Sequence, residues 1–525
     1  MPIFRCLIIK KLKFLQVVKF FLIALRLATN SPWRSSYNAL WLDVWLLLLP
    51  SALALLDREP ALPSVSTRND PAELWLNVRL NHFDASNTET FPMYRNSSGH
   101  IIIMVGGEWE IHPQWTQAGI AAELAQAVGA GMFYTEHRYY GQTRPNTSVG
   151  DLRFLTVDQA LGDLAQFIQY VKSDAFEDGY YKNGKVVLVG CSYAGSMATW
   201  MKLAYPHLID GAFSDSGPLH AQEDFPEYVE VINDAILEQG GANCLSSIQQ
   251  AVELLVRLLE TQTGPATISQ MFNTCSTISA STPLDVATFF WFGIQETFAY
   301  LVQYARPGDI PAACEVLTTD PVQRLANWIT SQPWTQPCIE TRYTEVVAAH
   351  TNTSYDHPQA VMRLWTYQTC VEYGWYQTTT GDGHPFLDTI PLEYFHQMCR
   401  DFFGTNFDEP LLRSGIERTN VLFAGWSHLP DHVVSVVGGH DPWGPMGPNV
   451  THATALAPVY LVPGISHCRA MQPRGTNETE LEATKVAVMN HLSVYLTGSE
   501  FFLSSAARTF ASALLMICVV FTVLL

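Results

Sequence analysis

The sequence predicts an α/β protein with a parallel sheet, because short apolar runs alternate with stretches of helical period in its first third. Each apolar run is continuously hydrophobic instead of alternating, as in a strand that is buried on both faces. A long stretch of mostly helical period, 225–400, then separates these runs from two later ones. These observations favour one sheet whose strands are divided by a helical insertion.

The first apolar run, residues 101–105, stops at two glycines and is followed by a helical stretch over 119–128. Residues 131–135 predict the next strand. An amphipathic pattern over 157–172 predicts a helix, and the apolar residues 185–189 predict a third buried strand. Alternation of strands and helices is typical of a doubly wound parallel sheet.

Strand signals return only at 433–437 and 458–462. We therefore expect one catalytic domain that is split by a helical cap. The predicted layout is an N-terminal extension with signal peptide (1–54), the first part of the catalytic domain (55–220), the helical cap (221–415), the second part of the catalytic domain (416–498) and a C-terminal tail (499–525).

Composition and charge restrict the class of protein. Of the 525 residues, 48% are hydrophobic and 15% are charged, which is typical of a globular protein. The formal net charge is −19, which argues against nucleic acid or an anionic lipid surface as the main partner. No feature of the sequence calls for a metal or a cofactor.

Both ends of the chain have the character of targeting signals. The apolar block 41–56 contains the small-x-small pattern of Ala52 and Ala54, as expected near a signal-peptide cleavage site, although an uncleaved signal anchor stays open. The last 16 residues, 510–525, are uncharged and mostly apolar. They are short for a membrane-spanning helix and favour a lipid-attachment (GPI) signal, with a transmembrane tail or a core helix as alternatives.

Glycosylation motifs and cysteines agree with a secreted protein. Ten cysteines are present, and eight remain when Cys6 and Cys518 are set aside with the two ends. An even number suits an oxidising compartment. The asparagines that open N-x-[ST] motifs are Asn96, Asn146, Asn352, Asn449 and Asn477.

The sharpest local motif is Gly-Cys-Ser-Tyr-Ala-Gly at 190–195. It directly follows a predicted buried strand and precedes a helical run over 196–204. A tight strand-to-helix turn exposes a serine hydroxyl at the carboxyl edge of a sheet, so Ser192 is the candidate nucleophile. Ala194 stands where the usual motif has glycine, which makes the match imperfect.

A serine needs a base to accept its proton and an acid to orient that base. Asp441 follows the strand predicted at 433–437, and His467 follows the one predicted at 458–462. The order Ser, Asp, His is that of the α/β-hydrolase fold. His440 is the rival base, but it adjoins the acid and follows no strand of its own.

The oxyanion that forms on attack needs N–H donors that are already in place. We expect one to be the backbone N–H of Tyr193 and the second to come from the loop after the first strand, at Gly107. Glu108 in the same loop could bind a substrate amine or cap the following helix.

Several segments together resemble peptidase family S28, a family of serine peptidases, and most closely its thymus-specific branch. The similarity covers about residues 76–496. The segments that carry it are GGEWE (106–110), EHRYYGQTRP (136–145), GCSYAGSMATWMKLAYPHLIDGAFSDSGPL (190–219), YQTCVEYGWYQT (367–378), GGHDPWGPMG (438–447) and GISHC (464–468).

The resemblance implies an α/β-hydrolase fold with a helical cap between nucleophile and acid, and a triad of Ser192, Asp441 and His467. Family members characteristically cleave after proline near a peptide end. In this sequence Trp443 could line a proline pocket. Trp375 and Tyr376 could do the same, with core aromatics as the alternative reading.

The resemblance also implies cysteine pairs within the cap, Cys370 with Cys399, Cys244 with Cys314 and Cys275 with Cys338. The chain departs from many relatives at Val437, where they have asparagine, and at Cys191, where they have glycine. Cys191 adjoins the nucleophile and Cys468 adjoins the base, so we expect these two to be spatial neighbours. We favour two buried thiols there over a disulfide.

The leading hypothesis is a serine exopeptidase of the secretory pathway that acts on peptides after proline. Carboxypeptidase and dipeptidyl peptidase action both stay open, as do an extracellular, cell-surface or lysosomal location and a homodimer. The alternatives are a carboxylesterase or lipase with the same fold, and a catalytically silent adhesion ectodomain.

Overall fold

The computed structural model describes residues 99–145, 148–317, 320–333 and 335–499, together with the backbone of β1 (Val78–Arg79) and β2 (Thr90–Phe91). These two short strands pair antiparallel. The predicted signal peptide and C-terminal signal lie outside the described residues. No helix among those described is long and apolar enough to cross a membrane.

The core of the structure is a six-stranded sheet in the order β10-β9-β6-β5-β3-β4, and every neighbouring pair is parallel. Five of these strands correspond to the apolar runs of the sequence, with shifts of one or two residues at their ends. The strands are β3 (His100–Val105), β4 (Ala130–Thr135), β5 (Val186–Cys191), β6 (Gly211–Asp215), β9 (Val433–Gly438) and β10 (Val459–Val462).

The strand β6 is the one that the sequence pattern does not reveal. Its residues, Gly-Ala-Phe-Ser-Asp, have low intrinsic strand preference, yet all five are buried between β5 and β9. Pairing on both edges supplies the backbone hydrogen bonds that the local sequence alone would not favour.

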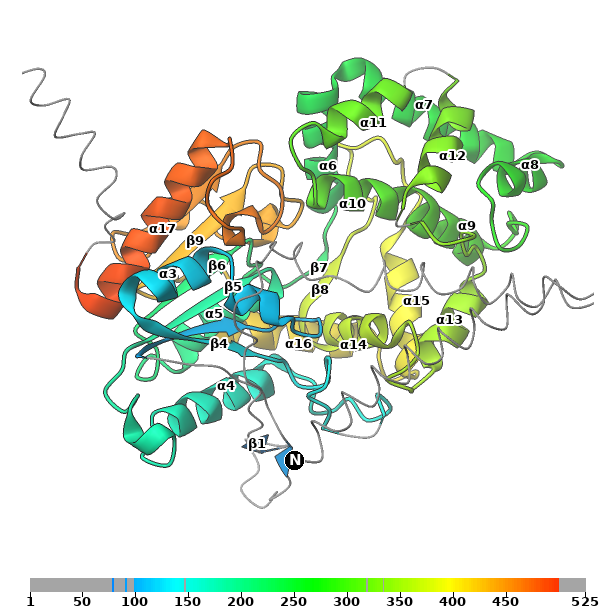
Figure 1. The fold of residues 1–525 in the computed structure, drawn as a ribbon. Coiled ribbons are helices and arrows are strands. Elements are labelled where there is room, and N and C mark those ends of the chain that lie inside the picture. Colours follow the sequence, from blue (N-terminus) through cyan, green and yellow to red (C-terminus); the bar gives the residue numbers. More distant parts are fainter. Residues whose placement is uncertain are drawn as a thin grey trace, which may run out of the picture. The chain divides into compact units, whose positions relative to one another are not determined.

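Helices cover both faces of the sheet (Figure 1). α3 (Ile120–Val128) packs against α17 (Thr479–Thr497), and α4 (Val157–Val171) packs against α5 (Tyr193–Ala204). Both layers bury apolar side chains against the strands. With its strand order and parallel pairing, this is the α/β-hydrolase fold.

Between β6 and β9 the chain forms the inserted helices, drawn mostly in green and yellow in Figure 1. They include two π-helical segments that continue neighbouring helices. Their bounds are α6 (Glu227–Gly240), α7 (Ala242–Leu259), α8 (Gly264–Met271), α9 (Pro283–Phe290), η3 (Trp291–Gln295), α10 (Glu296–Gln303), α11 (Asp309–Leu317), α12 (Pro321–Ser331), α13 (Tyr343–Thr351), α14 (Ala360–Gln368), η4 (Thr369–Tyr373), α15 (Leu392–Phe403) and α16 (Glu409–Phe423).

A small parallel sheet of β7 (Gln222–Asp224) and β8 (Gly374–Tyr376) joins the start of this insertion to its middle. Short 3-10 helices complete the described structure. They are η1 (Pro113–Thr116), η2 (Glu177–Gly179), η5 (Gly444–Met446), η6 (Val450–His452) and η7 (Arg469–Met471).

Candidate active site

The three predicted catalytic residues lie beyond the carboxyl ends of three parallel strands. Ser192 directly follows β5, Asp441 follows β9, and His467 follows β10. Because the strands are parallel, their carboxyl ends meet at one edge of the sheet. Residues that are 249 and 26 positions apart in the sequence, Ser192 to Asp441 and Asp441 to His467, are thereby gathered at the same edge.

Ser192 has the strained backbone of a sharp strand-to-helix turn, with φ 56° and ψ −136°. The helix α5 begins at the next residue, earlier than the start at 196 that the sequence predicts. Gly190 and Gly195 are needed at this turn, because a Cβ at Gly190 would lie 2.1 Å from the carbonyl oxygen of Ala194 and one at Gly195 would lie 2.9 Å from Ser214 Oγ. Ala194 itself is buried without such a conflict, so its methyl group is compatible with the turn.

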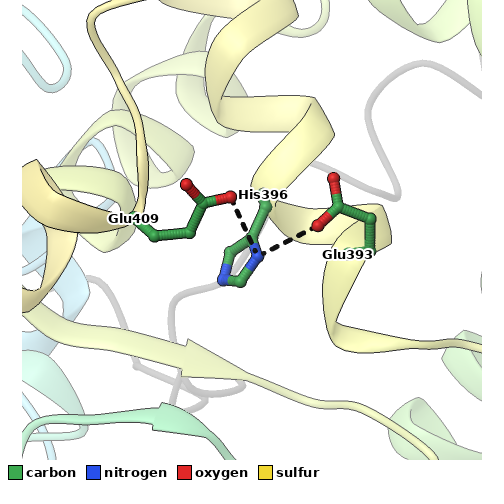
Figure 2. Close-up of side chains that lie close together, drawn as sticks. All are labelled: Glu393, His396 and Glu409. Atoms are coloured by element: carbon green, nitrogen blue, oxygen red, sulfur yellow. Dashed lines mark hydrogen bonds and ion pairs between the residues drawn. The ribbon is translucent and has the colours of Figure 1, made fainter.

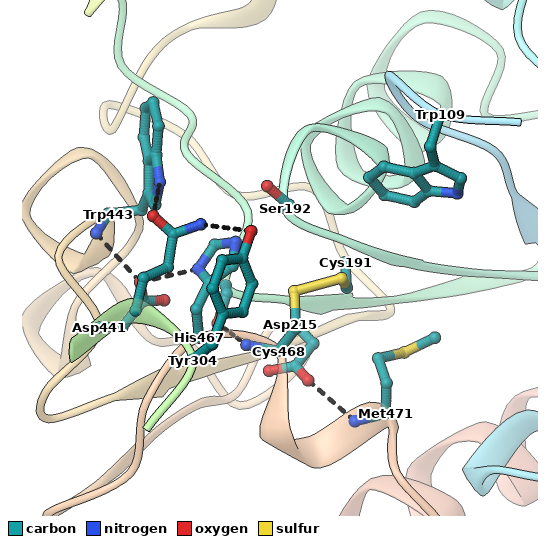
Figure 3. The surroundings of a disulfide bond; sticks show 12 residues. Trp109, Cys191, Ser192, Asp215, Tyr304, Asp441, Trp443, His467, Cys468 and Met471 are labelled. Atoms are coloured by element: carbon teal, nitrogen blue, oxygen red, sulfur yellow. Dashed lines mark hydrogen bonds and ion pairs between the residues drawn. A yellow bond between two sulfur atoms is a disulfide. The ribbon is translucent and has the colours of Figure 1, made fainter. Parts of the chain in front are cut away.

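The imidazole of His467 is held by Asp441 (Figure 3). Nδ1 of His467 lies 2.7 Å from Oδ1 of Asp441, which also accepts a hydrogen bond from the backbone N–H of Trp443 at 3.0 Å. Both side chains are buried. The other ring nitrogen, Nε2, has no hydrogen-bond partner among the described residues. This arrangement leaves Nε2 available as a proton acceptor.

Nearby carboxylates favour the protonated form of the His467 ring. Burial works against the protonated ring, but Asp441, with help from Asp215 and Glu108, outweighs burial and raises the pKa of His467 above its ordinary value. Asp215 lies at the end of β6, and burial raises its pKa to about 7. The imidazolium that forms when a base takes up a proton is therefore stabilised at this site.

The rival base, His440, points to a different part of the molecule. Its Nδ1 lies 2.9 Å from Nε2 of Gln239, and its Nε2 lies 2.9 Å from a carboxylate oxygen of Glu238, both on α6. Both of its ring nitrogens are therefore engaged by the inserted helices, whereas His467 keeps Nε2 open.

The predicted oxyanion donors lie at the expected elements. Tyr193 is the first residue of α5, where backbone N–H groups have no partner within the helix. Gly107 is buried in the loop after β3, and an added Cβ there would lie 2.7 Å from the ring of Trp109. Glu108 is also buried, and its charge acts on His467, so this carboxylate belongs to the surroundings of the candidate base.

Two of the three candidate aromatic residues lie together. The rings of Trp443 and Trp375 pack edge to face with their centroids 5.8 Å apart. Tyr376, the next residue on β8, instead stacks on Phe395 at 4.9 Å, and its hydroxyl lies 3.0 Å from the sulfur of Cys399. Successive strand residues point to opposite faces, which explains why only one of this pair faces Trp443.

The expectation of two buried thiols beside the catalytic residues is wrong. Cys191 and Cys468 form a disulfide bond, with their Cα atoms 5.7 Å apart. The local sequence shows only that each cysteine adjoins a candidate catalytic residue. The sheet brings their Cα atoms to a separation that a disulfide can bridge. Because Ser192 and His467 are the neighbours of these cysteines, the bond also shows that the candidate nucleophile and the candidate base lie close together.

The insertion between β6 and β9 contains the three cysteine pairs that the family resemblance implies, Cys244–Cys314, Cys275–Cys338 and Cys370–Cys399. Disulfides of this number indicate a protein of the secretory pathway. Of the predicted glycosylation sites, Asn352, Asn449 and Asn477 are exposed, whereas Asn96 and Asn146 lie outside the described residues.

A buried polar network lies beneath the nucleophile turn, and no sequence signal reveals it. The hydroxyl of Tyr193 accepts hydrogen bonds from Gln368 Nε2 at 3.0 Å and from Tyr373 at 3.3 Å. Nδ1 of His137 pairs with the carbonyl of Arg138 at 2.7 Å, so its Nε2 accepts from Tyr193 at 3.2 Å. Burial lowers the pKa of His137 to about 4, which keeps the ring neutral.

Asp215, the last residue of β6, and Ser216 after it connect the loop of His467 to the turn of Ser192. The carbonyl of Asp215 accepts the backbone N–H of Ser192 at 2.9 Å, and its Oδ2 accepts the backbone N–H of Met471 at 2.9 Å. The hydroxyl of Ser216 accepts the backbone N–H of Cys468 at 2.9 Å. Because the sequence does not predict β6, it does not reveal these contacts either.

One group of side chains among the described residues has ligand atoms close enough to suggest a metal (Figure 2). It consists of Glu393, His396 and Glu409 in the inserted helices. Arg400 binds both carboxylates, and His396 Nε2 lies 2.7 Å from Glu223. The ligand atoms of this group are thus already engaged in a network of ion pairs.

Comparison with known proteins agrees with this geometry. The family model described as serine carboxypeptidase S28 matches residues 78–488. The chain is 28% identical to the thymus-specific serine protease of Mus musculus over 81% of this chain and 88% of that protein. It is 28% identical to the lysosomal Pro-X carboxypeptidase of Bos taurus over 39% of this chain and 44% of that protein.

Among solved structures, a proline iminopeptidase-related protein of Thermus thermophilus is similar with a TM-score of 0.33 and 12% identity, covering 81% of this chain and 99% of that one. Similarity at this level says nothing of the activity. The family model, in contrast, spans the whole sheet and the inserted helices. The chain belongs to the serine carboxypeptidase S28 family, and it is a serine-type peptidase.

Proposed function

We propose that this peptidase removes residues from peptide ends by cleaving after proline, with Ser192, His467 and Asp441 as its catalytic triad. The observation that carries the proposal is the buried pair of His467 and Asp441, 2.7 Å apart, at the sheet edge where Ser192 stands on a strained turn. Such a pair orients a base toward a nucleophile and stabilises its positive charge.

The reaction follows from these groups. Ser192 Oγ attacks the carbonyl carbon of the scissile bond while its proton passes to Nε2 of His467. The imidazolium then donates this proton to the leaving amine, and an acyl-enzyme ester forms on Ser192. A water molecule, deprotonated by the same Nε2, hydrolyses the ester and regenerates the hydroxyl. The N–H groups of Tyr193 and Gly107 are the proposed donors to the oxyanion.

Aromatic side chains beside the triad support a preference for proline. Trp443 is two residues from Asp441, and its ring packs against those of Trp375, Phe225 and Tyr228. Flat aromatic faces bind the rigid ring of proline with little loss of side-chain entropy. The bovine relative is named a Pro-X carboxypeptidase, which agrees with this preference.

A fluorophosphonate probe tests whether the triad is active. The secreted protein should be labelled covalently, and Ser192→Ala should lose the label. An unlabelled wild type would support the alternative of a silent adhesion ectodomain. Hydrolysis of prolyl peptides without hydrolysis of aryl esters distinguishes a peptidase of this specificity from a carboxylesterase or lipase.

The direction of exopeptidase action is a separate question with its own experiment. Digestion of a proline-containing peptide library, read by mass spectrometry, reports whether single residues leave the carboxyl end or dipeptides leave the amino end. Release of neither product, with cleavage inside the peptides, would contradict exopeptidase action.

We further propose that the mature protein is tethered outside the cell through a lipid attached near Gly498 or Ser499. The 16-residue apolar tail would span about 24 Å as a helix, which is short of the roughly 30 Å hydrocarbon core. Phosphatidylinositol-specific phospholipase C should release active enzyme from expressing cells. Retention of the protein with peptides from the tail still attached would favour a transmembrane tail.

A further inference from the structure

Gln303, the last residue of α10, contacts the loops of both the proposed acid and the proposed base. Its backbone carbonyl accepts the backbone N–H of His467 at 3.1 Å. Its side-chain Oε1 accepts the indole N–H of Trp443 at 3.1 Å. We infer that Gln303 is a positioning residue through which the inserted helices hold these two loops in their catalytic arrangement. The inference rests on the proposed function, since it takes Asp441 and His467 as acid and base.

The amide of Gln303 is fixed in one orientation. The indole nitrogen of Trp443 can only donate, so the amide oxygen must face it. The same oxygen accepts the hydroxyl of Tyr228 at 2.7 Å, and Nε2 donates to the hydroxyl of Tyr304 at 2.9 Å. The amide thus accepts two hydrogen bonds and donates one, and this fixes the side chain that supports the indole of Trp443.

The contact with Trp443 reaches the acid directly. The backbone N–H of Trp443 donates to Oδ1 of Asp441 at 3.0 Å, and this is the oxygen that holds Nδ1 of His467 at 2.7 Å. Gln303 therefore supports the acid through its side chain and the base through its main chain. A small displacement of either loop would change the orientation of the His467 imidazole relative to Ser192.

The end of the helix adds an electrostatic contribution. The carbonyl of Gln303 accepts no hydrogen bond within α10, because the last carbonyls of a helix lack partners there. It accepts the backbone N–H of His467 instead. The guanidinium of Arg469 donates to the carbonyl of Ala305 at 3.1 Å, just beyond the same helix end. The partial negative charge of a helix carboxyl end favours a positive charge nearby, such as the imidazolium formed during catalysis.

The first test removes the amide and keeps the main chain. Gln303→Met loses the acceptor for Trp443 and Tyr228 but preserves a good helix former at this position. We expect the rate of fluorophosphonate labelling and kcat/KM for a prolyl peptide to fall about tenfold to a hundredfold, as expected for misplaced catalytic groups. Melting temperatures establish that the variants are folded.

Gln295→Met is the matched control. Gln295 is a buried glutamine of the same continuous helix, and its Nε2 donates to the carbonyl of Gln377 at 2.7 Å, away from both catalytic loops. If the rate loss reflected only weakened packing of the inserted helices, this variant would show it too. We expect Gln295→Met to lower the melting temperature without lowering the labelling rate.

Gln303→Glu gives a readout that a purely structural role would not produce. A carboxylate still accepts from Trp443 and Tyr228, and it adds a negative charge to those of Asp441, Asp215 and Glu108, which already act on His467. Arg469 is the cation of the same loop. The rate at high pH should be largely retained, while the acid limb of kcat/KM moves to higher pH.

The outcomes separate the inference from the proposed function. Full labelling of His467→Ala would remove that residue as the base and defeat the triad itself. If His467→Ala and Ser192→Ala are inactive but Gln303→Met stays within about twofold of the wild type, the positioning role is wrong while the triad stands. An unchanged pH profile of Gln303→Glu would likewise contradict the positioning role of Gln303, even if Gln303→Met does not fold.

Discussion

A disulfide bond joins Cys191 to Cys468, and these two residues immediately flank Ser192 and His467. The bond closes a loop of 277 residues that includes all of the inserted helices. It therefore links the turn of Ser192 covalently to the loop of His467, in addition to the hydrogen bonds that Asp215 accepts from Ser192 and Met471. We expect this bond to serve both stability and catalytic geometry.

Loss of this disulfide should lower stability and rate together. Replacing both Cys191 and Cys468 with serine should cost about 2–5 kcal/mol of folding free energy. The labelling rate with a fluorophosphonate should also fall, because the turn and the loop can then move relative to each other. Thermal unfolding and labelling at a temperature where the variant is folded measure the two effects separately.

The pair Cys244–Cys314 in the inserted helices is the control for this experiment. Its double serine variant should lose stability but keep the labelling rate of the remaining folded protein. If both double variants keep the wild-type rate, the disulfide beside the triad contributes to stability alone.

The pH dependence of activity should report His467. Its pKa is raised, against the effect of burial, by Asp441, Asp215 and Glu108, and the ring must be neutral to accept the proton of Ser192. Activity should therefore be lost as pH falls through a value above the ordinary range of histidine. A profile of kcat/KM against pH for the free enzyme measures this limb.

Replacing Asp215 should move this acid limb. With a pKa of about 7, Asp215 carries part of a negative charge where His467 titrates, and Asp215→Asn removes it, so the acid limb should shift to lower pH. Asp285→Asn is the matched control, because Asp285 is also buried and accepts a backbone N–H, from Tyr343 at 2.9 Å, but belongs to the inserted helices. Equal shifts in the two variants would contradict a direct effect on His467.

Glu372 should make folding stability depend on pH. It is buried, and loss of hydration raises its pKa to about 8 from an ordinary value of 4.5. The contribution of Glu372 to the free energy of unfolding is therefore fully present below about pH 4.5 and is lost as pH rises toward 8. Compared with Glu372→Gln, the wild type should lose melting temperature across this interval; a constant difference between the two would show that Glu372 is not protonated in the folded state.

Trp375 should contribute to substrate binding through Trp443. Trp375→Leu removes the ring that packs against Trp443 and should raise KM for prolyl peptides by about tenfold, with a smaller change in kcat. Tyr376→Phe serves for comparison, since Tyr376 lies on the opposite face of β8 and stacks on Phe395. A rise in KM from Tyr376→Phe alone would reverse the assignment of these two aromatics.

The sequence predicts a strand correctly where a run of hydrophobic residues is also buried in the folded protein. The apolar runs of β3, β4, β5, β9 and β10 are buried strands, because continuous hydrophobic residues can be buried on both faces of a parallel sheet. The sequence does not predict β6, because Gly, Ser and Asp carry no strand signal and its pairing comes from β5 and from the distant β9.

In the candidate site, too, some features follow from the local sequence and others from the tertiary structure. The turn around Ser192 has a partly local cause, since a Cβ at Gly190 would collide with the carbonyl of Ala194 in the same turn, whereas the space at Gly195 is limited by Ser214 on β6. The sequence by itself thus determined the fold class, the family and the candidate triad, because each candidate catalytic residue lies in the turn or loop that follows a run with its own hydrophobic signature.

Only the tertiary structure decided which side chains contact and orient the three candidate catalytic residues. The disulfide of Cys191 and Cys468, the support of Trp443 by Gln303, and the contact of Asp215 with Ser192 all join segments separated by 23 to 277 residues. No local pattern encodes such contacts. They depend on the order of strands in the sheet and on the place where the inserted helices return to its edge, and both are set by packing of the whole chain.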